Sequence, residues 1–80
     1  SPAHSGLLSA TVISQDDVLA DALSTALFVM GSDKAAAYWQ GSKDVFEMVL
    51  ITEDNRILCS EGIADSFTPT GKYSMEVISR

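Results

Sequence analysis

The stretch LADALSTALFVMG, residues 19–31, reads as a helix that is apolar around most of its circumference. Because successive residues of an α-helix lie about 100° apart, its apolar side chains fill a continuous arc of roughly 200°. Asp21, Ser24, Thr25 and Phe28 occupy the remaining sector. So wide an apolar arc predicts a helix that is buried in a domain core, and it raises the question of what the polar residues in its middle do.

The boundaries of this helix follow from its flanking residues. We expect it to span about residues 18–30, because Asp16 or Asp17 can accept hydrogen bonds from its first free N–H groups and Gly31 provides a left-handed stop. A second, shorter helix is expected over KAAAYWQ, residues 34–40, before the loop GSKD at 41–44. Ser32 or Asp33 can cap it, which places two helices in succession.

The rest of the chain has the pattern of strands. Runs of β-branched and apolar residues, some with alternating polarity, predict strands at residues 5–14, 45–53, 56–63 and 73–79, the last at an edge. Asp54-Asn55 fits a two-residue hairpin turn, and residues 64–72 read as a loop. The order β-α-α-β-β-β predicts an α+β fold, in which two helices cover one face of a mainly antiparallel sheet.

Composition excludes several classes of function. The chain has 80 residues, enough for one small domain, and 46% of them are hydrophobic, which favours an ordered globular chain. The formal net charge is −6 and there is no basic cluster, so nucleic acid is an improbable partner. An acidic protein that handles phosphates would do so most naturally through a bound cation.

Asp21 and Thr25 are the candidate ligands for such a cation. They are four residues apart, so their side chains are neighbours on one face of the predicted helix. A carboxylate beside a hydroxyl suits a hard cation such as Mg²⁺, which completes its shell with water and phosphate oxygens. The alternative interpretation of the same spacing is an ordinary solvated helix face.

The sequence of this segment resembles that of the ApbE family. ADALSTALFVMG at 20–31 follows the strand LSATVIS and precedes VLITEDNRILCSEGI at 49–63, in an order that matches the family over residues 7–63. The resemblance implies a flavin transferase that moves FMN from FAD onto a Thr of a target protein and releases AMP. It also implies that Asp21 and Thr25 ligate the Mg²⁺ that holds the FAD pyrophosphate.

The resemblance has further implications for the whole protein. The family carries a His-x-x-Asp-Pro-x-Thr-Gly stretch and a long N-terminal part with most flavin contacts, and neither precedes Ser1 here. We therefore expect residues 1–80 to be a single C-terminal fragment of a larger ApbE-like domain, inactive alone, with residues 64–80 a variable extension. The longer protein would be a lipoprotein in a bacterial periplasm or on the outer face of the cell membrane.

Alternatives to transfer remain open at this stage. The same fold could serve as a non-catalytic flavin-binding or interaction module, or as an FAD pyrophosphatase. The fragment alone is expected to self-associate through its bare apolar surfaces and to bind FAD weakly or not at all. The catalytic base, the flavin-contacting residues and the target protein are not assigned.

Four other residues could bind a ligand or react, but each has a simpler interpretation. His4 stands alone and reads as a loop histidine, and Cys59, the only cysteine, reads as a buried structural thiol. Tyr38 and Trp39 could stack on a flavin or an adenine, but packing of the second helix onto the sheet is the simpler explanation.

Overall fold

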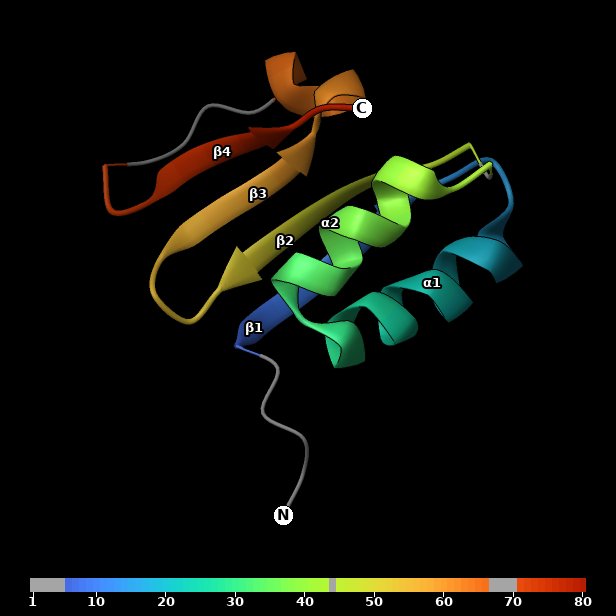
Figure 1. Cartoon of the computed structure of the whole chain (residues 1–80), viewed down its shortest axis with the longest axis horizontal. Coiled ribbons are helices and arrows are strands. Elements are labelled where there is room, and N and C mark those ends of the chain that lie inside the picture. Colours follow the sequence, from blue (N-terminus) through green and yellow to red (C-terminus); the bar gives the residue numbers. More distant parts are fainter. Residues whose placement is uncertain (1–5, 44, 67–70) are drawn as a thin grey trace.

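The computed structural model describes residues 6–43, 45–66 and 71–80. Within these residues, four strands form one sheet in the order β1-β2-β3-β4, and both α-helices pack on the same face (Figure 1). Neighbouring strands run antiparallel except β3 and β4, which are parallel. The predicted α+β class and the order β-α-α-β-β-β are therefore confirmed. The elements are β1 (Leu7–Ile13), α1 (Asp17–Met30), α2 (Ser32–Gly41), β2 (Glu47–Thr52), β3 (Arg56–Ser60), the 3-10 helix η1 (Glu61–Ser66) and β4 (Ser74–Ile78).

The core lies between the two helices and one face of the sheet. Side chains alternate along a strand, so Phe46, Met48 and Leu50 point to the same face, and each is at most 2% exposed. Leu23 and Leu27 of α1 belong to the same buried cluster. The alternating pattern of residues 45–53 thus predicted the strand, which spans Glu47–Thr52.

α1 is buried along one stripe only, in agreement with the expectation that part of its apolar surface is left bare within residues 1–80. Leu23 and Leu27 are its only buried residues, whereas Val18 is 80% exposed and Val29 is 61% exposed. The reason is its position: α1 packs on β1 and beside α2, and no described element covers its outer side. Because the apolar arc is wider than the covered stripe, apolar side chains such as Val18 and Val29 lie on the surface.

Gly31 serves both helices. Its φ of 84° ends α1 in the left-handed region as predicted, and the same residue is the N-cap of α2. Ser32 is already the first residue of α2, and no side chain caps that helix, so the prediction of a Ser32 or Asp33 cap was wrong. At the start of α1, Asp16 Oδ1 accepts hydrogen bonds from two backbone N–H groups at 3.0 and 3.1 Å, which confirms the first cap.

The hairpin between β2 and β3 forms at the predicted place, but residues 53–55 connect the two strands, so its loop has one residue more than the predicted two-residue turn. Asn55 has a φ of 66°, a conformation that Asn adopts more readily than most residues. Its N–H donates to the carbonyl oxygen of Thr52 at 3.3 Å, which closes the turn.

β3 ends three residues earlier than predicted, and residues 61–66 form η1 rather than strand or loop. At the end of β3 the buried Ser60 Oγ accepts a hydrogen bond from Met48 N at 2.9 Å, so a side chain takes the place of a ladder bond. Gly62 then lies against Glu47: a Cβ on Gly62 would stand 2.2 Å from Glu47 Oε2.

The C-terminal segment belongs to the sheet. β4 pairs in parallel with β3 over five residue pairs, and Ile78 joins the buried cluster. The prediction of a final edge strand is confirmed. Of the loop predicted at 64–72, residues 67–70 lie outside the described residues, as do His4 and the rest of residues 1–5, and Asp44 of the GSKD loop.

Candidate metal site

Asp21 and Thr25 lie one turn apart on the exposed side of α1. Thr25 Oγ1 donates a hydrogen bond to the backbone carbonyl oxygen of Asp21 at 3.3 Å, and Ser24 Oγ donates to the same oxygen at 2.9 Å. Both hydroxyl protons are therefore directed at the helix backbone. The hydroxyl oxygens keep lone pairs that can bind a cation.

The Asp21 side chain borders a groove between α1 and β1. The groove has a volume of about 300 Å³, and its lining consists of Ala10, Thr11 and Val12 from β1 with Ala20, Asp21 and Ser24 from α1. Within the described part of the chain, the Asp21 carboxylate makes no hydrogen bond and no ion pair, so both of its oxygens are available. The sequence pattern did not single out Thr11. This residue lines the groove because α1 packs on β1.

This donor set fits a hard cation that brings ligands of its own. Over residues 6–43, 45–66 and 71–80, no three His, Cys, Asp or Glu side chains gather closely enough to hold a metal ion. A carboxylate and a hydroxyl can hold Mg²⁺ when water and phosphate oxygens complete its shell, which is the usual arrangement for Mg²⁺ at phosphate substrates. The residues present are compatible with a metal–phosphate site and do not form an all-protein metal cage.

Trp39 is part of the core rather than an open stacking surface. It is 2% exposed, and its Nε1–H donates to the carbonyl oxygen of Phe46 at 2.9 Å. The guanidinium carbon of Arg80 lies 4.3 Å from the centre of the ring, and Arg80 also donates to the carbonyl oxygen of Trp39 at 3.2 Å. The packing interpretation is therefore confirmed for Trp39. Tyr38 is 38% exposed, and its ring is tilted by 37° to that of Phe46, with the ring centres 6.2 Å apart.

Cys59 is fully buried, as predicted. Burial raises the pKa of its thiol, because an apolar surrounding disfavours the thiolate. A thiol that stays protonated is a poor nucleophile and a poor metal ligand.

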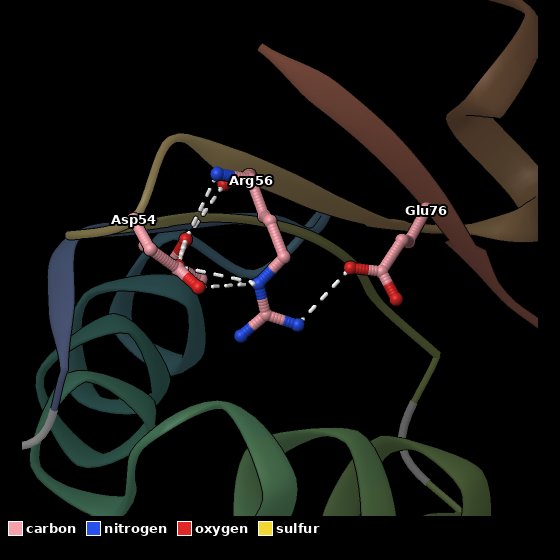
Figure 2. Close-up of polar contacts among 4 residues, drawn as sticks. Asp54, Arg56 and Glu76 are labelled. Carbon is pink, nitrogen blue, oxygen red and sulfur yellow. Dashed lines mark hydrogen bonds and ion pairs between the residues drawn. The ribbon is translucent and has the colours of Figure 1, made fainter.

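A polar cluster ties the hairpin tip to β4, as Figure 2 shows. Arg56 Nε donates to both carboxylate oxygens of Asp54 at 3.2 Å, and its NH1 group donates to Glu76 at 3.1 Å. Thr52 Oγ1 also donates to Asp54. The Thr52 hydroxyl, and after it the Arg56 guanidinium, hold the pKa of Asp54 below its ordinary value. All charges of this cluster are paired, so its role is structural: it links the hairpin tip to β4. We call this cluster of Asp54, Arg56 and Glu76 the clasp.

A second groove of about 570 Å³ opens where β1 ends and β2 begins. Its lining is mainly apolar and includes Ile13, Leu19 and Phe46, with Asp16 and Glu47 as its charged residues. One oxygen of Glu47 is buried without a hydrogen-bond partner among the described residues. Asp21 does not line this groove, so this groove is separate from the one that the Asp21 side chain borders.

Comparisons with known proteins agree with the sequence signature. Searches of curated proteins and of solved structures found no match. No helix formed by the described residues has the length and apolar character needed to cross a bilayer. The model of the ApbE family matches residues 1–50, which include β1, both helices and the Asp21–Thr25 pair. This chain therefore belongs to the ApbE family.

Proposed function

We propose that this chain is the C-terminal part of a Mg²⁺-dependent FAD:protein FMN transferase. The observation that carries the proposal is the Asp21–Thr25 pair, which lies on the exposed side of a helix inside the ApbE match. The Asp21 carboxylate has no hydrogen-bond or ion-pair partner among the residues that the structure describes, and it stands one turn from the Thr25 hydroxyl. The flavin contacts would come from a preceding part of the longer protein. By family inference, that protein would be a lipoprotein of the periplasm or of the outer face of the bacterial membrane.

The reaction transfers a phosphoryl-linked flavin. The hydroxyl oxygen of the acceptor Thr forms a bond to the phosphorus that carries the riboflavin, the bond from this phosphorus to the AMP oxygen breaks, and AMP leaves with the electron pair. Bound Mg²⁺ would neutralise charge on the pyrophosphate and on the departing AMP. A base, not assigned in this chain, takes the hydroxyl proton.

The residues of α1 would divide the binding of the cation between them. Asp21 supplies an anionic oxygen, and Thr25 supplies a neutral oxygen that a water molecule can replace. Ser24, whose proton is directed at the Asp21 carbonyl oxygen, stabilises this turn of the helix. Loss of the Asp21 charge should therefore matter more than loss of the Thr25 hydroxyl.

The test is a mass measurement on the longer protein with Mg²⁺, FAD and a candidate target protein. The target should gain the mass of FMN less one water, and AMP should appear in equal amount. Asp21→Asn should abolish both products, whereas the matched control Asp17→Asn, an exposed carboxylate in the first turn of the same helix, should retain them. AMP and free FMN without modification of any target would identify a pyrophosphatase and contradict the proposal.

A further inference from the structure

Two elements of this fold have few buried side chains of their own. Of the five residues of β4 only Ile78 is buried, whereas Val77 is 50% exposed. The ten residues of α2 bury only Ala35 and Trp39. An element with so few buried side chains opens locally at a low free-energy cost unless other contacts hold it in place.

Residues 79 and 80, which follow β4, connect these two elements, and we call them the strap. Gln40 Nε2 on α2 donates a hydrogen bond to the carbonyl oxygen of Ser79 at 2.9 Å. In the opposite direction, the Arg80 guanidinium donates to the carbonyl oxygen of Trp39 at 3.2 Å, and its carbon lies 4.3 Å from the centre of the Trp39 ring. The backbone N–H of Arg80 donates to Glu61 of η1 at 3.3 Å, which holds the strap at a third point.

Arg80 also supplies a group that the end of α2 lacks. The last turn of α2 contains no basic residue, and the last carbonyl oxygens of a helix have no partner within it. A cation at this end is favoured because it interacts with the negative end of the helix dipole. Arg80 donates to one of these carbonyl oxygens, that of Trp39, from a position 41 residues further along the chain. The end of α2 therefore depends on a residue that follows β4.

We propose that the strap makes β4 and the last turn of α2 one cooperative unit, which opens and closes as a whole. When the strap is released, β4 loses its hydrogen bond from Gln40, and α2 loses the cation at its C-terminal end. Both elements then open more often. Because α2 packs beside α1, the strap joins the C-terminal strand to the helix layer. All of its contacts form within residues 1–80 and do not depend on the proposed function.

Hydrogen exchange of backbone amides, followed by NMR on the 80-residue chain, tests the strap from both of its ends. Arg80→Ala should accelerate exchange at least about threefold both in the last turn of α2 and in β4, because a cation–π contact and a hydrogen bond from a charged group are lost. Gln40→Ala changes α2 only, yet it should accelerate exchange in β4 as well. The matched control is Lys72→Ala, which removes an exposed positive charge that forms no ion pair with the described residues. Exchange in both elements should stay unchanged in this control.

Three outcomes would overturn the inference. If Arg80→Ala accelerated exchange in β4 alone, or Gln40→Ala in α2 alone, the two elements would open independently. If exchange accelerated equally in β1 and β2, β4 and α2 would open only with the whole chain. An equal effect of Lys72→Ala would show that net charge, and not the strap, sets the exchange rates.

Discussion

Replacement of Trp39 by Phe tests whether this side chain is a structural anchor. The change removes the Nε1–H that donates to the buried carbonyl oxygen of Phe46 at 2.9 Å. It also removes part of a ring that is 2% exposed and lies 4.3 Å from the guanidinium of Arg80. Three separate contributions to the free energy of unfolding are therefore lost together.

Their sizes can be set from general magnitudes. A buried carbonyl without its donor costs about 1–3 kcal/mol. The lost ring carbons cost about 1–2 kcal/mol at ~0.8 kcal/mol per buried carbon group. A weaker cation–π contact costs about 0.5 kcal/mol. The total of about 2.5–5.5 kcal/mol corresponds to a fall in Tm of at least about 10 °C, since 1 kcal/mol shifts the Tm of a domain of this size by about 4–8 °C.

Thermal unfolding followed by far-UV circular dichroism measures this effect. Tyr38→Phe on the same helix is the matched control: Tyr38 is 38% exposed, and its Tm should change by no more than about 4 °C, because surface substitutions are typically worth ±0.5 kcal/mol. A fall of less than about 5 °C for Trp39→Phe would refute the assignment of Trp39 to the core and would reopen the stacking interpretation.

Four further outcomes are expected. In the longer protein, Asp21→Ala should abolish Mg²⁺-dependent FMN transfer and Thr25→Ala should weaken it less; full activity of the Asp21 variant at low Mg²⁺ would disprove the ligand assignment. Cys59 should react slowly with a thiol reagent in the folded chain and rapidly in denaturant, since it is buried and its pKa is raised; equal rates would show that the thiol is accessible. The folded pKa of Asp54 lies below the unfolded value of 3.8, so its contribution to stability is present above that pH and is lost as the pH falls through the folded pKa. Urea unfolding of Asp54→Asn should therefore show a smaller loss of stability on acidification below pH 4 than the wild type, and identical acid profiles would contradict the clasp. The 80-residue chain should self-associate through exposed apolar residues such as Val18 and Val29 and should bind FAD weakly or not at all; a monomer across a wide concentration range in sedimentation, or micromolar FAD affinity by calorimetry, would contradict these expectations.

Local signals predicted the fold well because several elements of this chain carry their own boundary chemistry. Asp16 caps α1, Gly31 ends it, and Asn55 adopts the positive φ that the hairpin requires. The end of β3 was not predictable from its own residues. It depends on Ser60 replacing a ladder bond and on Gly62 meeting Glu47, and both contacts join segments more than ten residues apart.

The candidate site was predictable only in part, for the same physical reason. Helical periodicity places Asp21 beside Thr25 without knowledge of the fold. Whether this face of α1 is exposed depends on how α1 packs against β1, and so does the position of Thr11 in the wall of the groove beside Asp21. The width of the apolar arc of α1 indicates how much apolar surface the helix has, but not which of its side chains the other elements of residues 1–80 cover.

Binding of Mn²⁺, which prefers the same oxygen ligands as Mg²⁺, tests whether Asp21 holds the cation. The 80-residue chain is titrated with Mn²⁺ in the presence of inorganic pyrophosphate, and paramagnetic broadening of amide signals is followed for the wild type, Asp21→Asn and Asp17→Asn. The amide signals of residues 21–25 should broaden first in the wild type and in Asp17→Asn, and this broadening should disappear in Asp21→Asn. Unchanged broadening in Asp21→Asn, or broadening centred on another acidic residue, would contradict it.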